Sequence, residues 1–421
     1  MASIQIIITY TFKNVLYVMK KIILSGGWSY GNLGDEAILI SSINLIHQKF
    51  PEYVIIVLLY RKNETVKFLE QLDYIVIEQS LHSLMFGVEK KRMDFGDGVL
   101  KDLLVPIQRR VNNRLKPFQR KKDLLSFLKS PVTFYKKYDT AYNYFSKLCK
   151  DAEIYVMSGG GYLNNWNEMI ISKNFEVQIA KQNNLKTYII GQTVGPFNKY
   201  AKQVYSLILD KIDNCFFRDI ESIKDTKSTG HACLPYIVPD IALSEETVYE
   251  KDNYIVFIPF LTDLNKHIDD IISNIKSIVS ESGGKVVITV TQQWAWCIQI
   301  ATSFYIAMKS DGLDVKLIIP EDYKELEALL SSAEFVFSQN LHGLIMAYRG
   351  HTPIVCLNDR RKFVSFMETI GHMENLIAPT QITKTNLYEC YKNKESFAFD
   401  NCKDFRKQIY DSFSLIINNN V

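Results

Sequence analysis

Two residues are the clearest candidates for anion binding and proton transfer, His342 and Arg218. His342 lies in the run 338–344, SQNLHGL, where an apolar strand is expected to end and a helix to begin at about His342. The free amide groups of such a turn bind anions, and a histidine there can donate a proton at neutral pH. Arg218 follows the apolar run 215–217, and its planar guanidinium suits a carboxylate or a phosphate. The pair predicts a site that holds an anion and protonates it.

Structural roles explain the same residues in a simpler way. A lone histidine is more often a packing residue than an acid, and Arg218 can form a surface ion pair with Asp219. The basic run Arg360-Arg361-Lys362, which follows another strand, can bind phosphate or simply begin an exposed helix. The place of His342 at a strand–helix turn opposite the first half of the chain favours the functional interpretation.

Three loops that contain glycine are further binding candidates. They are the runs 29–36 (SYGNLGDE), 158–161 (SGGG) and 191–197 (GQTVGPF), each after an apolar strand. Glycine lets the backbone turn tightly or approach a ligand. Each loop also has a structural interpretation: Asp35 can cap a helix, the glycines of 158–161 can pack on a neighbouring helix, and 191–197 can be a turn without a ligand. With the second-half loops, the predicted substrate-binding residues are Asn32, Gly34, Asp35, Gly160, Gly161, Gln192, Thr193, Asn340, Leu341, Gly343, Arg360, Arg361 and Lys362.

The elements that must position these residues form a repeated strand–helix pattern. Continuous apolar runs such as 54–59 and 254–258 are typical of strands in a parallel sheet covered on both faces. The chain of 421 residues is long enough for two domains. We therefore predict an α/β fold of two Rossmann-like domains, residues 19–245 and 252–400, facing across a cleft in the GT-B-like arrangement. Residues 1–18 are expected to be an extension outside the fold.

A basic helical insertion is predicted over about 86–150 of the first domain. It holds 16 Lys or Arg against 6 Asp or Glu, with aromatic residues such as Phe127, Phe134 and Tyr135 between them. A solvated helical surface is one interpretation. A surface for anionic lipid head groups or a diphosphate-linked acceptor is the other, and nucleic acid is a weaker third option.

Composition argues against several classes of protein, among them nucleic-acid-binding, membrane-spanning and metal-binding proteins. The net charge of +3 does not by itself indicate nucleic acid, and no apolar run is long enough to cross a bilayer. The seven cysteines form no CxxC pair, so we expect no metal site and no redox motif, but buried thiols in a reducing cytoplasm.

Taken together, these motifs resemble the polysaccharide pyruvyl transferase family. The resemblance extends over most of the chain, and the order and spacing of the motifs make it specific. It is carried by Gly31-Asn32-Leu33-Gly34-Asp35-Glu36, Gly159-Gly160-Gly161, Gly191-Gln192-Thr193-Val194-Gly195-Pro196, Arg218-Asp219, Pro239-Asp240 and Leu341-His342-Gly343.

The resemblance implies transfer of pyruvate from phosphoenolpyruvate, a co-substrate, onto two sugar hydroxyls to form a ketal, with no metal or other cofactor. His342 matches the family's histidine, as general acid, and Arg218 would hold the donor. Backbone amides near His342 would receive the departing phosphate. The family usually has an arginine where this chain has Asn340, so Arg360, Arg361 or Lys362 would have to compensate.

The expected partner is a glycan or lipid-linked oligosaccharide, in the cytoplasm with peripheral contact with the inner membrane surface, and not nucleic acid. Two other functions remain open. One is a GT-B glycosyltransferase that uses a nucleotide sugar, since the fold does not decide between them. The other is a non-catalytic protein that binds glycan or an assembly partner.

Overall fold

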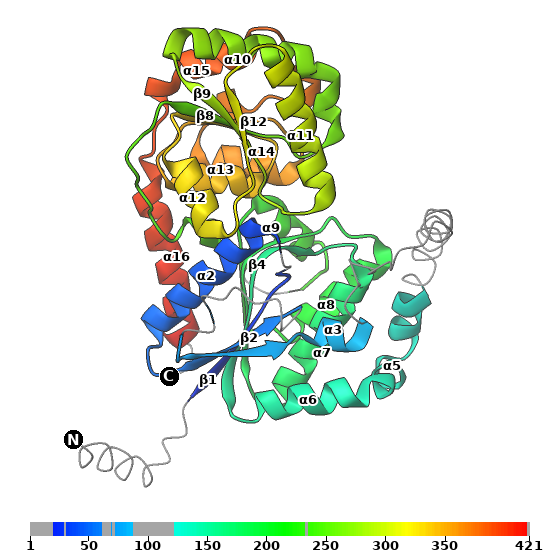
Figure 1. Cartoon of the computed structure of the whole chain (residues 1–421). Helices are drawn as coiled ribbons and strands as arrows, with labels where there is room; N and C mark the ends of the chain where they lie inside the picture. Colours follow the sequence, from blue (N-terminus) through cyan, green and yellow to red (C-terminus); the bar gives the residue numbers. More distant parts are fainter. Residues whose placement is uncertain are drawn as a thin grey trace, which may run out of the picture.

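The protein folds into two α/β units, each built around its own parallel sheet (Figure 1). The structure is a computed structural model that describes residues 20–28, 31–60, 69, 72–86, 122–231 and 235–418. The predicted α/β fold of two Rossmann-like units is confirmed. Both sheets lie within the predicted domain ranges.

The first sheet has the strand order β3-β2-β1-β4-β5-β6-β7, and its paired strands are parallel. The order reverses between β1 and β4, which is where open α/β sheets bind ligands. The strands are β1 (Lys21–Ser25), β2 (Val54–Leu59), β3 (Ile75–Gln79), β4 (Ala152–Leu163), β5 (Lys186–Val194), β6 (Asn214–Phe217) and β7 (Pro235–Ile237).

The second sheet repeats the same winding in the order β10-β9-β8-β11-β12, again with parallel pairing. Its order reverses between β8 and β11. The strands are β8 (Tyr254–Ile258), β9 (Lys285–Thr289), β10 (Val315–Ile318), β11 (Phe335–Ser338) and β12 (Ile354–Cys356).

Helices cover both faces of each sheet (Figure 1). Those of the first unit include α2 (Leu33–Lys49), α3 (Leu81–Phe86), α5 (Pro131–Tyr135), α6 (Asp139–Cys149), α7 (Asn167–Gln182), α8 (Lys199–Leu209) and α9 (Ile220–Lys227). The second unit follows the short helix η3 (Ile241–Leu243) and includes α10 (Ile268–Ser282), α11 (Ala295–Ser310), α12 (Tyr323–Ser331), α13 (Leu341–Arg349), α14 (Arg361–Ile370) and α15 (Asn386–Lys392).

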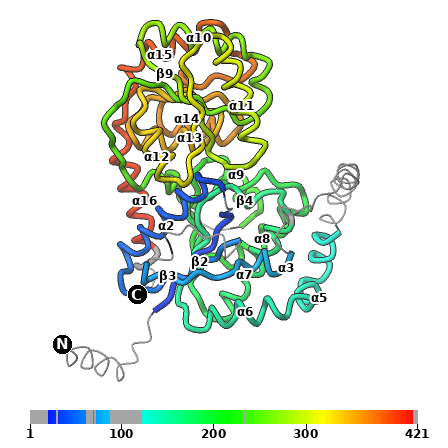
Figure 2. Tube along the Cα trace, viewed as in Figure 1, coloured from blue at the N-terminus to red at the C-terminus, as the bar shows by residue number. Residues whose placement is uncertain are grey.

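The last helix, α16 (Asn401–Asn418), returns from the second unit to the first and lies beside α2 (Figure 2). Lys49 of α2 donates to Ser414 at 2.5 Å and its ammonium lies 3.0 Å from the ring centroid of Tyr410. One hydrophobic cluster runs through α2, η3, α13 and α16. Because this buried surface is shared, the two sheets are held together by apolar packing as well as by the chain connection.

The predicted strands are all present, but two of the glycine motifs lie inside strands and not after them. β4 continues through Gly159–Gly161 to Leu163, and β5 continues through Gln192 to Val194. The sequence analysis also did not predict β3 and β7. Both are edge strands with partly exposed residues, so they lack the continuous apolar pattern of the inner strands.

Most of the basic insertion, residues 87–121, lies outside the described residues. The described part, 122–150, is mainly helical, and several of its aromatic residues face inward. Phe127, Phe134 and Tyr135 are buried, and the Tyr135 ring stacks on Phe175 of α7 with centroids 3.8 Å apart. These three aromatic residues therefore belong to the core of the first unit.

Among the described residues, no helix is long and apolar enough to cross a membrane. The cysteines that the structure describes are free thiols, and all but Cys390 are buried. No cluster of His, Cys, Asp and Glu that could hold a metal was found in the same part of the chain.

Candidate active site

A small cavity lies between the two units, at the edge where the strands of both sheets end. Its volume is about 20 Å³, enough for roughly one water molecule. The first unit supplies Thr193, Arg218, Asp219, Asp240 and Leu243, and the second supplies Leu341, Ile345, Lys362, Ser365, Phe366 and Thr369.

Arg218 is fixed in this cavity by two neighbours. It follows β6, its Nε donates to Thr193 Oγ1 at 2.7 Å, and its Nη1 pairs with Asp240. The remaining guanidinium nitrogen, Nη2, faces Gly161, where an added Cβ would lie 3.8 Å away. Arg218 is thus oriented before any ligand arrives, which reduces the entropy lost on binding.

Two carboxylates support that arrangement. Asp240 precedes η3 and accepts from Ala242 N at 3.0 Å as well as pairing with Arg218. Asp219 caps α9 by accepting from Ser222 N at 2.7 Å and also accepts from Thr193 at 2.7 Å. The sequence analysis named both residues but did not predict that Asp240 is the acid paired with Arg218. The signal was weak because 22 positions separate the two.

His342 lies in the first turn of α13 and packs directly on Gly34, in the first turn of α2. An added Cβ on Gly34 would lie only 1.8 Å from His342 Nδ1. This close approach explains a glycine that would otherwise weaken the start of a helix. His342 Nε2 is buried and has no hydrogen-bond partner among the described residues.

The pKa of His342 is lowered to about 3, mainly by burial and to a smaller extent by the positive charges of Arg218 and Lys362, against an opposing effect of Asp240. The imidazole of the free protein is therefore neutral near pH 7. An anionic ligand between Arg218 and Lys362 would offset those two charges. Ligand binding is thus expected to raise the pKa of His342 and prepare it to carry a proton.

Lys362 is the second cation of the cavity. Its side chain lines the cavity and remains accessible to solvent, although protein atoms surround it on several sides. It forms no ion pair with any described acidic residue. Burial lowers its pKa to about 8, with a smaller contribution from Arg218. Arg218 and Lys362 both line the cavity, and of the two only Arg218 is paired with a described carboxylate. Two such positive groups favour an anion between them.

The two neighbouring arginines are placed differently. Arg361 forms an ion pair with Asp225 at 2.6 Å and a longer one with Asp219 at 3.4 Å, so it connects α14 to the first unit. Arg360 is exposed just before α14 and does not line the cavity. Of the three basic residues predicted to bind substrate, the structure brings only Lys362 into the cavity.

The predicted anion site on the backbone of α13 is occupied by the protein itself. Asn340 caps the helix, and its Oδ1 accepts from His342 N at 3.0 Å and from Gly343 N at 3.4 Å. Those two amides therefore already have an acceptor in the protein itself, while the binding roles of Asn340 and Gly343 stay predictions. Gly343 instead lets α13 pack closely, since an added Cβ would lie 2.7 Å from Ile258. Leu341 does line the cavity.

The loop before α2 pairs with the second unit. Leu33 N donates to Thr291 O at 3.0 Å, and Asn32 forms a backbone bridge with Gln292. Asn32 is buried in this contact, and its side-chain Oδ1 has no hydrogen-bond partner among the described residues, so its binding role stays a prediction. Asp35 is half-buried in the first turn of α2, where Asn32 holds the N-cap position, and its charge favours the protonated form of Lys362.

Gln192 and Gly160 are also structural. Gln192 is fully buried, and its amide donates to Ser158 O and to Gly159 O at 3.1 Å, so it connects β5 to β4 and cannot reach a sugar. Gly160 is buried with φ of +118°, a backbone conformation that favours glycine. Thr193 and Gly161 lie beside Arg218 as predicted.

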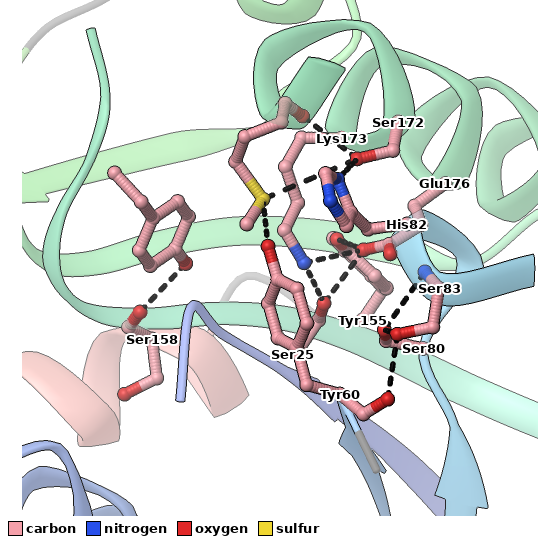
Figure 3. Close-up of polar contacts among 12 residues, drawn as sticks. Ser25, Tyr60, Ser80, His82, Ser83, Tyr155, Ser158, Ser172, Lys173 and Glu176 are labelled. Atoms are coloured by element: carbon pink, nitrogen blue, oxygen red, sulfur yellow. Dashed lines mark hydrogen bonds and ion pairs between the residues drawn. The ribbon is translucent and has the colours of Figure 1, made fainter. Parts of the chain in front are cut away.

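A buried polar cluster fixes the end of β1 below the first glycine loop (Figure 3). Lys173 donates to Glu176 at 3.0 Å and to Ser25 at 2.5 Å, and Tyr155 donates to Glu176 at 2.7 Å. Lys173 and Glu176 are almost fully buried, and burial lowers the pKa of Lys173. The sequence analysis missed this ion pair because its charged residues lie in an ordinary helix, α7.

Comparison with known proteins agrees with this fold and sequence pattern. The family model described as polysaccharide pyruvyl transferase matches residues 32–360, most of the chain. A search of curated proteins found no match.

Solved structures of UDP-N-acetylglucosamine 2-epimerases share the fold. The enzyme from Methanocaldococcus jannaschii is 13% identical with a TM-score of 0.53, and the match covers 89% of this chain and 92% of that one. The enzyme from Neisseria meningitidis, bound to UDP-GlcNAc, is 11% identical with a TM-score of 0.51, and the match covers 93% and 96%. Identity this low supports the fold only.

Proposed function

Because the chain belongs to the polysaccharide pyruvyl transferase family, we propose that it transfers pyruvate from phosphoenolpyruvate onto two hydroxyls of one sugar, forming a pyruvate ketal. The acceptor is a surface or capsular polysaccharide or its lipid-linked precursor. We place the reaction in the cytoplasm, with peripheral contact with the inner membrane surface when the acceptor is lipid-linked.

One observation carries the proposal: Arg218 and Lys362 enter the same cavity from opposite units, beside His342. Phosphoenolpyruvate carries a carboxylate and a phosphate, and two cations on opposite walls suit such a donor. Arg218 offers its Nη2 and Lys362 its ammonium, and neither group pairs with an acidic residue in the part of the chain that the structure describes. Because Asn340 occupies the first amides of α13, these side chains and not the helix backbone hold the phosphate.

The first chemical step is protonation of carbon 3 of the donor. His342 accepts a proton when the anionic donor binds, and it then transfers that proton to carbon 3, which leaves carbon 2 electron-deficient. Asp240, on the other side of Arg218, favours the protonated imidazole. Gly34 lets the ring stay close against α2, which fixes its position relative to the donor.

The remaining steps form two carbon–oxygen bonds and break one. A sugar hydroxyl adds to carbon 2, the bond from carbon 2 to the phosphate oxygen breaks, and the second hydroxyl closes the ring. The two hydroxyls release two protons. One restores the proton that His342 gave to carbon 3, and the other leaves with inorganic phosphate. Arg218 and Lys362 stabilise the departing phosphate because both are positively charged.

The proposal is tested by incubating the protein with phosphoenolpyruvate and a panel of free and lipid-linked glycans. We expect release of inorganic phosphate together with a glycan whose mass has increased by one ketal. Arg218→Met should abolish both, whereas Lys309→Met, an exposed lysine at the end of α11, should change neither.

Other outcomes identify the two alternatives. Release of a nucleoside diphosphate from a nucleotide sugar, with no reaction of phosphoenolpyruvate, would indicate a glycosyltransferase. Full biological activity of His342→Ala would indicate a protein that only binds glycan or an assembly partner.

A further inference from the structure

We propose that an aromatic patch on the second unit, made of Phe260, Trp294 and Trp296, binds the acceptor glycan next to the sugar that is modified. This inference rests on the proposed function and names where its acceptor lies. The predicted acceptor side was the basic insertion of the first unit; the patch lies on the opposite unit, on residues that the motif analysis did not use.

The three rings form a continuous surface. The centroids of Phe260 and Trp296 are 5.0 Å apart, and those of Trp294 and Trp296 are 6.0 Å apart. Trp296 is 42% exposed although it is a large apolar residue in the first turn of α11. An exposed tryptophan supported by two other rings presents a rigid apolar face. Contiguous exposed apolar faces of this kind mark binding surfaces.

The position of the patch connects it to the cavity. Phe260 follows β8 and Trp294 follows β9, whereas the turn at His342 follows β11. These three strands are neighbours in the order β9-β8-β11, so the loops that carry Phe260 and Trp294 begin one and two strand spacings, roughly 5–10 Å, from the start of that turn. The patch and the turn therefore lie at the same edge of the sheet.

The patch is also fixed to the cavity by one side chain. Gln339 immediately precedes the cap of α13, and its Oε1 accepts from Phe260 N at 2.9 Å and from Leu261 N at 2.5 Å. Its Nε2 donates to Asp263 at 2.5 Å. The loop that carries Phe260 is therefore hydrogen-bonded to the residue just before the turn that carries His342, which suits two subsites of one substrate.

The chemistry of the patch favours a neutral glycan. From Ala295 to Met308, α11 carries no charged residue, and the residue one turn beyond Trp296 on the same face is the exposed Gln299. The C–H face of a sugar ring packs against an aromatic ring, and its hydroxyls bond to neutral amides. A nucleic acid or an anionic membrane would require positive charge here.

The experiment measures glycan binding without the donor. Tetrasaccharides of glucose, galactose, mannose and N-acetylglucosamine are titrated into the full chain and followed by calorimetry and tryptophan fluorescence. We expect at least one to bind, with about tenfold or greater weakening in Trp296→Ala and recovery in Trp296→Phe. Ile306→Ala is the matched control, because Ile306 is 57% exposed on the same helix, roughly 15 Å from Trp296.

Each other outcome overturns this inference without deciding the proposed reaction. No binding of any tetrasaccharide, or equal binding by Trp296→Ala, removes the patch as a glycan site. Loss of a dimer in Trp296→Ala, with glycan binding unchanged, makes it a contact between copies of the chain. In turnover assays we expect Trp296→Ala to raise KM for the acceptor and leave KM for phosphoenolpyruvate unchanged. If the parent chain itself shows no turnover while glycan binding depends on Trp296, only the proposed function is contradicted.

Discussion

Gly34 and His342 meet where the N-termini of α2 and α13 approach each other from the two units, close enough that a single added carbon on Gly34 would lie 1.8 Å from His342 Nδ1. The two residues are more than 300 positions apart in the chain. The packing of a glycine against an imidazole fixes the proposed acid at the junction of both units.

Gly34→Ala should therefore displace the His342 ring and lower both activity and stability. Overpacking of this kind typically costs about 1–3 kcal/mol. In the double variant Gly34→Ala/His342→Ala the clash is absent, so chemical denaturation should show stability recovered while activity stays lost. Additive losses of stability in the double variant would mean that the two side chains do not interact.

Donor binding should be accompanied by proton uptake by His342. The pKa of His342 is about 3 in the free protein. An anion between Arg218 and Lys362 should raise it, because it would offset two of the charges that lower it. Calorimetric titration of phosphoenolpyruvate in buffers of different ionisation enthalpy should reveal this proton. In His342→Gln, uptake should disappear even if the donor still binds; persistence of uptake would assign the proton to another group.

The same histidine should make stability depend on pH. In the unfolded chain its pKa is about 6.5, so between pH 6.5 and about 3 the unfolded state binds a proton that the folded state does not. The free energy of unfolding should therefore be unaffected by His342 above pH 6.5. Below that pH it should decrease by up to about 1.4 kcal/mol per pH unit, because protonation of His342 favours the unfolded state. The difference between the unfolding curves of His342→Gln and the parent chain should show that slope.

Lys362 should make donor affinity fall at alkaline pH. Its pKa is about 8, so the ammonium is charged below that pH and loses its charge as the pH rises through it. We expect kcat/KM for phosphoenolpyruvate to decrease above pH about 8. Lys362→Arg should remove the decrease because arginine stays charged, and Lys362→Met should have low kcat/KM throughout. An unchanged profile in Lys362→Arg would assign the titration elsewhere.

Asn340→Arg should raise donor affinity while lowering stability. The substitution adds a cation and frees the amides of His342 and Gly343, which Asn340 now caps. Loss of the cap should cost about 1 kcal/mol of stability, and a charge-assisted hydrogen bond to the donor contributes about 1.5–3 kcal/mol. Asn340→Asp is the control that keeps the cap and should weaken donor binding. Unchanged or weaker binding in Asn340→Arg would show that this loop serves another ligand.

The sequence by itself determined the fold class and much of the strand pattern. Runs such as Val54–Leu59 and Tyr254–Ile258 are buried along their whole length, and their continuous apolar character follows from helices on both faces of a parallel sheet. Because the carboxyl ends of such strands share one edge, the sequence also predicted that Arg218 and the His342 turn would face a common region.

Only the tertiary structure decided which polar groups remain available to a ligand. Gln192 and Asn340 have the side chains of binding residues, yet backbone atoms nearby use their amide groups, and no sequence spacing indicates that. Arg361 and Lys362 are adjacent in sequence, but helical geometry directs one to Asp225 and the other into the cavity. Such assignments depend on contacts between residues far apart in the chain, which exist only when both units are folded against each other.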